Sequence, residues 1–409
     1  RSVLYDDVKR LKFRVLWEIY TGFHQNHVLK DSGLAREFLD FTAKNSFWLD
    51  DYALFRHLKD AHSWASWTRW EEPLRRRDPA ALRACAAENE HRVLFFKYLQ
   101  WVLDRQWRAA RAKSESAGIL LMGDLPFMVD QESSDVWSRQ NEFDIDTEVG
   151  APPDAFSETG QRWGLPACRW REAEKNDFEW WRNKVRRAGD LYNVFRIDHM
   201  VGFFRTWTIP RDPALKPDFD IKDEHEQRAR GRRFLEAVSG AGRMLPVAED
   251  LGVIPPFVRE VLGELSIPGY KIMRWEKKPD GNYIEPENYP PVSLATSSTH
   301  DNEPLAEWWE TVYYPEKGLF WKMVSGRDEK PPAFSRFRDA VVRKLLKAAS
   351  ALVVLPLQDI LGVRDRINVP GTVNSGNWTY RTPCAAETML TRYPSRLGKF
   401  ADMVKEERK

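Results

Sequence analysis

The sequence predicts an α/β protein whose parallel strands alternate with helices. Two observations support this fold class. From Gly118 onward, short apolar runs alternate with stretches of helical spacing, a pattern typical of parallel sheets. Three of these runs also stop at an acidic residue, where a strand would give way to a loop.

Residues 1–115 precede this part of the chain and are predicted to be mainly helical. Apolar residues recur three and four positions apart in FWLDDYALFRHLKDA and again in HRVLFFKYLQWVLDRQWRAAR, as one face of a helix requires. The segment EEPLRRRDPAAL, charged and with two prolines, separates helices.

Six apolar segments after residue 115 are the strand candidates. They read AGILLMGDLPF, LYNVFRID, RMLPVAED, GYKIMRW, VSLATSS and ALVVLPLQD. Helical stretches lie between several of them, notably EQRARGRRFLEAV and PPFVREVLGEL. No glycine-rich phosphate loop follows a strand, because GAGR at 240–243 precedes one, so a nucleotide-binding sheet is not indicated.

The segment 130–175 has little regular periodicity and is predicted to be an ordered loop over the active site. Long loops in compact domains are usually functional lids or binding surfaces. Disorder is the alternative, but the segment is rich in large rings, which disordered segments lack. These are Trp137, Phe143, Phe156, Trp163 and Trp170.

The bulk composition narrows the class of partner. Lysine and arginine number 63 against 61 acidic residues, a net charge of +2, so neither nucleic acid nor an anionic membrane is an expected partner. The 18 Trp, 22 Phe and 12 Tyr suit the apolar faces of neutral sugars. The three cysteines are few and odd in number, which favours a reduced, cytoplasmic chain. No run of about 18 apolar residues is present to span a membrane. The sequence does not begin with methionine, so export stays an alternative.

The acidic residues at the strand ends are Asp198, Glu249 and Asp301. Side chains two positions apart on a strand share a face, so Arg196 is expected beside Asp198. A single acid at such a place could simply cap a helix or pair with an arginine. Three in the same context favour carboxylates that converge on one glycosidic bond.

Cleavage of a glycosidic bond needs a nucleophile or stabilising carboxylate and a proton donor. Arg196 would keep Asp198 ionised, which suits a nucleophile, while partial burial would raise the pKa of Glu249 and suit a proton donor. Asp301, with His300, would hold sugar hydroxyls. Competing chemistries lack their motifs, since no HExxH, GxSxG or GxxxxGK[ST] sequence occurs.

These motifs resemble the 4-alpha-glucanotransferases (amylomaltase or disproportionating enzyme), glycoside hydrolase family 77 of the alpha-amylase superfamily. The likeness runs from FWLDDYALF to RINVPGTVNSGNWTYR, and FRIDHMVGF, VAEDLGV and STHDNE carry the three acids in order. The resemblance implies that Asp198 is the nucleophile, Glu249 the acid and base, and Asp301 the third carboxylate. Further sugar-binding positions are implied by three more motifs, GDLPFMVDQESSDVW, APPDAFSETGQRWGLPACRW and INVPGT. Together, the motifs imply these substrate-binding residues: Arg196, His300, Asp124, Asp154, Phe156, Trp163 and Asn368.

The resemblance further implies a (β/α)8 barrel with inserted helical subdomains, one catalytic domain over 1–409, with most of the barrel in 116–409. It implies transfer of α-1,4-glucan segments from a donor to a sugar acceptor, with no metal or organic cofactor. No segment of this sequence matches the family's N-terminal segment, so the first barrel strand is expected to be missing. The isolated chain is then expected to fold poorly or to have weak activity. An α-glucan hydrolase and a non-catalytic glycan-binding barrel are the alternatives, and the oligomeric state is left open.

Overall fold

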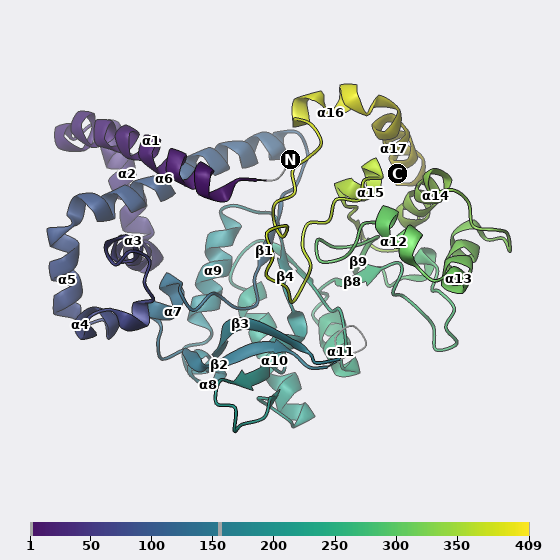
Figure 1. Ribbon diagram of the computed structural model, residues 1–409, viewed down its shortest axis with the longest axis horizontal. Coiled ribbons are helices and arrows are strands. Elements are labelled where there is room, and N and C mark those ends of the chain that lie inside the picture. The colour runs from purple at the N-terminus through teal and green to yellow at the C-terminus, as the bar shows by residue number, and fades with distance from the viewer. Residues whose placement is uncertain (1–2, 154–157, 409) are drawn as a thin grey trace. The chain divides into compact units, whose positions relative to one another are not determined.

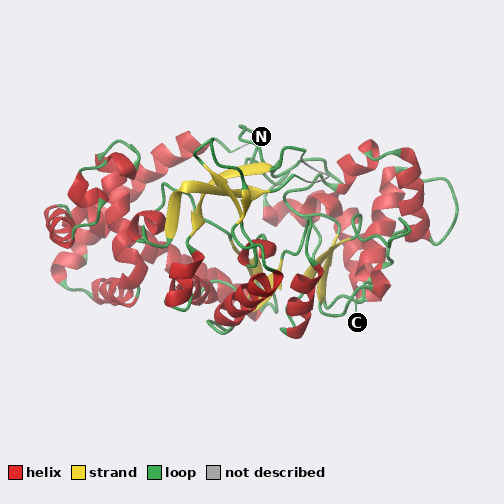
Figure 2. Ribbon diagram, turned by 90° about the horizontal axis from the view of Figure 1, so that it is seen from below, coloured by secondary structure: helices red, strands yellow, loops and turns green. Residues whose placement is uncertain are grey.

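The fold is seen in a computed structural model that describes residues 3–153 and 158–408 (Figure 1). The chain divides into two compact units. One unit is Tyr5–Leu245, and the other is Pro246–Lys409 together with Arg1–Leu4. Helices predominate, and the strands are short (Figure 2).

Residues 5–116 are helical apart from short connections. The helices are α1 (Tyr5–Asn26), α2 (Gly33–Lys44), α3 (Ser46–Ala61), α4 (Glu72–Arg75), α5 (Pro79–Glu88) and α6 (Glu90–Ser116). Two of them begin at side-chain caps that satisfy exposed backbone N–H groups. Ser32 accepts from the N–H of Ala35, and Asp78 accepts from those of Ala80 and Ala81.

Aromatic side chains make the core of this helical region. Tyr20 and Phe23 of α1 face Tyr98 and Trp101 of α6, with the rings of Phe23 and Tyr98 4.7 Å apart. Phe38 of α2 packs edge-on against Phe23 and is fully buried. Each buried ring removes a large apolar area from water, so this core accounts for much of the aromatic content.

Two parallel strands follow the helices in the same unit. Strand β1 (Met122–Leu125) pairs with β4 (Val194–Ile197), and this register sets Asp124 opposite Arg196. The connection includes α7 (Ser134–Ser138), α8 (Trp170–Lys175) and α9 (Glu179–Gly189), and α10 (Glu224–Ser239) comes after β4.

The segment 130–175 is more regular than the sequence predicted. It contains β2 (Phe143–Ala151) and β3 (Gln161–Cys168), which pair antiparallel in a sheet of order β3-β2-β5-β6 with β5 (Trp207–Pro210) and β6 (Asp218–Phe219). Backbone pairing can form without strict alternation of side chains when both faces are partly exposed, and β2 also carries register irregularities. The periodicity of the sequence therefore hid this hairpin.

The other unit holds four parallel strands and the remaining helices. Strand β7 (Leu245–Ala248) pairs with β8 (Gly269–Ile272), β8 with β9 (Ser293–Thr296), and β9 with β10 (Leu352–Val353). The helices are α11 (Pro256–Glu264), α12 (Leu305–Thr311), α13 (Tyr314–Ser325), α14 (Phe334–Leu346), α15 (Leu357–Leu361), α16 (Ala386–Arg392) and α17 (Pro394–Glu407). Trp309 and Phe337 stack 3.5 Å apart in the core of this unit.

All six strand candidates from the sequence are strands, and the α/β class with parallel strands is confirmed. The complete (β/α)8 barrel is not confirmed. Within residues 3–153 and 158–408 the parallel strands are β1 and β4 in one unit and β7 to β10 in the other, which makes six, whereas a (β/α)8 barrel has eight.

Gly123 of β1 provides a test of the strand packing next to Asp124. A Cβ atom built on Gly123 would lie 2.3 Å from the ring of Tyr192, which real Cβ atoms do not tolerate. We therefore expect Gly123→Ala to lower the free energy of unfolding by about 1–3 kcal/mol, measured by chemical denaturation. Gly263→Ala is the matched control, because its Cβ would meet nothing within 4 Å and α11 would gain helix propensity. Equal effects of the two changes would contradict this account.

Candidate active site

The end of β4 carries a buried arginine between two carboxylates. Arg196 is only 6% exposed, and its Nη1 lies 2.9 Å from Asp124 Oδ2 and 2.9 Å from Asp198 Oδ1. Asp124 reaches it from the neighbouring strand β1 through the parallel register. The side-chain alternation that predicted Arg196 beside Asp198 is thereby confirmed.

Asp198 is held by the backbone of β1 as well as by Arg196. Its N–H donates to the carbonyl of Leu125 at 3.1 Å, which extends the strand pairing by one residue. Its Oδ2 accepts the N–H of Phe127 at 3.2 Å. With a cation on one oxygen and an N–H on the other, the carboxylate is stabilised in its ionised form and fixed in direction.

Rings lie beside this carboxylate. His199 packs edge-on against Trp163 of β3 at 4.7 Å between ring centroids and against Phe127 at 5.1 Å. Burial lowers the pKa of His199 to about 4, opposed by Asp198 and reinforced by Arg196. The imidazole is therefore neutral near pH 7 and can donate one hydrogen bond and accept another.

Asp301 lies in a turn after β9 and belongs to the other compact unit. Its Oδ1 accepts from Asn368 Nδ2 at 2.6 Å, and its Oδ2 lies 3.3 Å from His300 Nε2. The sequence named all three residues, and the structure brings them together. The turn itself is closed by Thr299, whose Oγ1 accepts the N–H of Asp301 at 3.2 Å.

Two residues of this cluster escaped the sequence analysis. Arg366 donates to the backbone carbonyls of Asp301 and Asn368, each at 2.9 Å, and so ties the two loops together. Trp378, 54% exposed, lies with its ring 5.3 Å from that of His300 and offers an apolar face beside the carboxylate. Loop-to-loop bonds of this kind leave no periodic signal in a sequence.

Glu249 follows β7 directly and is half-buried. The residue after it, Asp250, is 3% exposed and fixes the turn. Asp250 Oδ1 accepts the N–H of Tyr270 at 2.7 Å, and its Oδ2 lies 3.0 Å from Arg259 Nε. The sequence analysis passed over Asp250 and Arg259, although the pair Glu249-Asp250 stands at the same strand end.

Asp154 and Phe156, which the resemblance implies as substrate-binding residues, lie outside the described residues. Of the remaining candidates, Asp124, Trp163, Arg196 and Asp198 belong to one unit. Glu249, His300, Asp301 and Asn368 belong to the other. No three His, Cys, Asp or Glu side chains are grouped to hold a metal in the described ranges, and none of the helices there is long and apolar enough to cross a membrane.

Asp250 should stabilise the turn that carries Glu249. Asp250→Ala leaves the buried N–H of Tyr270 without its acceptor and removes the ion pair with Arg259, so we expect a loss of about 1–3 kcal/mol in the free energy of unfolding. Asp250→Asn keeps an acceptor for that N–H and should lose less. Chemical denaturation of both variants tests the expectation, which fails if they are equally destabilised.

His199 should make stability depend on pH. The pKa of His199 is about 4 in the folded chain, below the ordinary 6.5. Between these two values the imidazole binds a proton in the unfolded chain but not in the folded chain. Stability is then lost as the pH falls from about 6.5 to about 4, by at most about 1.4 kcal/mol per pH unit. His199→Phe, which keeps a ring in place, should flatten this slope in denaturation curves. An unchanged slope would assign the pH dependence to other groups.

Known proteins resemble this chain along most of its length. The family profile described as 4-alpha-glucanotransferase, glycoside hydrolase family 77, matches residues 1–386. The 4-alpha-glucanotransferase of Thermus thermophilus is 35% identical over 391 residues, which cover 90% of this chain and 75% of that protein. The 4-alpha-glucanotransferase of Chlamydia caviae is 32% identical over 402 residues, which cover 95% of this chain and 74% of that protein. The chain thus spans about three quarters of the length of these relatives.

A solved structure agrees with these sequence relatives. The amylomaltase from Streptococcus agalactiae in complex with acarbose superposes with a TM-score of 0.84 at 26% identity, covering 100% of this chain and 80% of that chain. The resemblance inferred from the strand-end motifs is confirmed. The chain belongs to the 4-alpha-glucanotransferases of glycoside hydrolase family 77.

Proposed function

We propose that this enzyme transfers α-1,4-glucan segments between maltooligosaccharides, or glucans derived from starch or glycogen, with retention of configuration. Asp198 is the nucleophile. The observation that carries the proposal is the pairing of Asp198 with the buried Arg196, which keeps the carboxylate ionised and ready to attack. The N–H of Phe127 on the second oxygen fixes the direction of attack.

Glu249 is the proposed acid and base. In the first step Asp198 bonds to the anomeric carbon, the glycosidic C–O bond breaks, and Glu249 gives its proton to the leaving oxygen. In the second step Glu249 takes the proton of an acceptor hydroxyl, whose oxygen attacks the anomeric carbon and frees Asp198. This chemistry requires both carboxylates at one glycosidic bond, and it calls on no metal or organic cofactor.

Asp301, His300 and Asn368 are proposed to hold the hydroxyls of the sugar under attack. Asp301 receives one protein hydrogen bond on Oδ1 and faces His300 on Oδ2, so its remaining lone pairs can accept sugar hydroxyls. Trp378, beside His300, adds a ring for an apolar sugar face. These contacts would strengthen as the sugar ring distorts toward the transition state.

Transfer in place of hydrolysis requires that a sugar hydroxyl reach the glycosyl–Asp198 bond before water does. We propose that the segment 150–170 excludes water and helps to bind the acceptor, with Asp154, Phe156 and Trp163 as substrate contacts. Trp163 supports this role, because its ring packs against His199, the neighbour of the nucleophile.

We also propose a fold, binding partners and a cellular location for the enzyme. We propose that the parallel strands belong to a (β/α)8 barrel within one catalytic domain, with residues 1–115 as a helical region. A glucan donor and a sugar acceptor are the expected partners. A cytoplasmic location, which the few cysteines favour, stays a prediction.

Incubation with maltotriose alone tests the activity. A glucanotransferase produces a ladder of longer and shorter oligomers, whereas a hydrolase produces only shorter sugars. Asp198→Ala and Glu249→Gln should each lower the rate of ladder formation by at least about a hundredfold, since each removes a chemical step. Both should keep the wild-type circular dichroism spectrum.

Asp328→Ala is the matched control for that experiment, because its carboxylate is 89% exposed and serves no proposed step. Its rate should equal that of the wild type. Turnover like the wild type in either active-site variant would overturn the assignment of that residue. Shorter products alone would establish a hydrolase.

A further inference from the structure

The turn that carries His300 and Asp301 runs from the end of β9 to the start of α12. Ser297 follows the last residue of β9, and Leu305 is the first residue of α12. Asp301 lies midway between Ser297 and Leu305 in the chain. Because the strand pairing of β9 ends at Thr296, the position of this turn depends on side-chain contacts, above all at its two ends.

One buried carboxylate, that of Asp359, holds both ends of the turn. Asp359 lies in α15 of the same compact unit and is only 1% exposed. Its Oδ2 accepts from the hydroxyls of Ser297 and Ser298, at 2.6 and 3.1 Å. Its Oδ1 accepts the N–H of Leu305 at 2.7 Å. These hydrogen bonds join the start and the end of the turn to a single side chain.

The helix that carries Asp359 is itself anchored. Leu361, two residues further along α15, is fully buried, and its carbonyl accepts from Arg396 of α17. Burial raises the pKa of Asp359, and the hydrogen bonds from the turn oppose that shift together with Arg274. A buried carboxylate is costly unless donors satisfy it, and here the donors come from the turn. The acid and the turn therefore stabilise each other.

Other contacts fix the shape of the turn or hold it at a single point. Asn302 Oδ1 accepts from Thr299 Oγ1 at 3.0 Å, which closes the turn on itself. Arg274, which is 4% exposed, donates to the backbone carbonyl of Glu303 at 2.9 Å. Asp359 differs because it bonds both the start and the end of the turn, so its loss would release the turn at two places.

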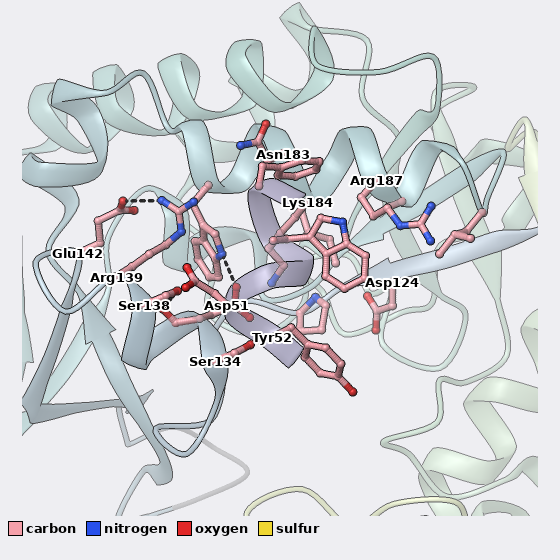
Figure 3. A pocket seen from close by; sticks show the side chains of 18 of the residues that line it. Asp51, Tyr52, Asp124, Ser134, Ser138, Arg139, Glu142, Asn183, Lys184 and Arg187 are labelled. Atoms are coloured by element: carbon pink, nitrogen blue, oxygen red, sulfur yellow. Dashed lines mark hydrogen bonds and ion pairs between the residues drawn. The ribbon is translucent and has the colours of Figure 1, made fainter. Parts of the chain in front are cut away.

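The surroundings of Asp359 exclude a direct contact with substrate. Asp124 shows the contrast, because its side chain is 45% exposed and lines a cavity of about 570 Å³ (Figure 3). Asp359 is covered by protein and its two oxygens face the turn, so no sugar can reach it. Any effect of Asp359 on the reaction must therefore pass through the residues of the turn.

We propose that Asp359 is a positioning residue, which holds the turn 297–305 so that the Asp301 carboxylate and the His300 ring meet the hydroxyls of the sugar under attack. The inference rests on the proposed function, in which Asp301 and His300 hold that sugar. A displacement of about 1 Å can cost a catalytic site a large part of its rate, so a turn released at both ends should slow the reaction. The loss should fall mainly on kcat, because the contacts of Asp301 would strengthen in the transition state.

Rates of ladder formation from maltotriose test the proposal. Asp359→Ala should lower kcat at least about tenfold, and the milder Ser297→Ala, which removes one of the three hydrogen bonds, about threefold. Asp359→Asn keeps an oxygen for the N–H of Leu305 and should retain part of the rate.

Ser350→Ala is the matched control. Its buried hydroxyl lies 2.7 Å from that of Ser293 at the opposite end of β9, so a similar hydrogen bond is lost away from the turn. Its kcat should equal that of the wild type. Asp359→Ala should also cost less than about twofold in a protein that already carries Asp301→Ala, because the group that it positions is then absent.

Proton NMR of the His300 ring reports on the turn without turnover. Its signals, assigned with His300→Gln, should shift in Ser297→Ala and stay in place in Ser350→Ala. Stationary His300 signals overturn the proposal, and so does a wild-type kcat in Ser297→Ala and Asp359→Ala, or an undiminished loss in the Asp301→Ala background. A wild-type protein that forms no ladder refutes the transferase function instead, while the His300 signals still decide whether Asp359 positions the turn.

Discussion

The buried guanidinium of Arg196 is the constraint on which the position of Asp198, the proposed nucleophile, depends. An unpaired charge at 6% exposure would cost several kcal/mol, so the fold must bring carboxylates to it. Parallel pairing of β1 and β4 does so by placing Asp124 opposite Arg196, and Asp198 follows at the end of the same strand. A slip of one residue in this register would turn the side chains to the other face. The register of β1 and β4 therefore also determines where the carboxylate of Asp198 lies.

Asp301 is positioned by a different principle. It lies five residues beyond the end of β9, where no strand pairing fixes the backbone. Side-chain hydrogen bonds take the place of strand pairing here. Arg366 donates to the backbone carbonyls of Asp301 and Asn368, and the side chain of Asn368 donates to the carboxylate of Asp301. Glu249 is an intermediate case, because it directly follows β7 but depends on Asp250 to tie its turn to β8. The further a carboxylate lies from a strand, the more its position relies on side chains distant in sequence.

This difference explains what the sequence could predict. Short apolar runs identified all six parallel strands of the described residues, and the period of two placed Arg196 beside Asp198. Asp250 and Arg366 were missed, because bonds to loops and to other side chains leave no regular spacing. The β2–β3 hairpin was missed for a related reason, since its register irregularities break the alternation that marks a strand. The confirmed family resemblance came from strand-end motifs, where local pattern and chemistry coincide.

A neutral polyol as substrate accounts for the way these polar groups are arranged. Asp198 and Asp301 both have protein donors or cations already, so a sugar need not neutralise either of them. Sugar hydroxyls can then add to their spare lone pairs with little electrostatic rearrangement, but each such bond contributes only modestly because water competes for it. The remaining selectivity is then expected to come from surfaces that water cannot match, and the faces of Trp163 and Trp378 are the proposed ones. We therefore expect the carboxylates to determine which reaction occurs and the rings to determine which glucan chain is held long enough to undergo it.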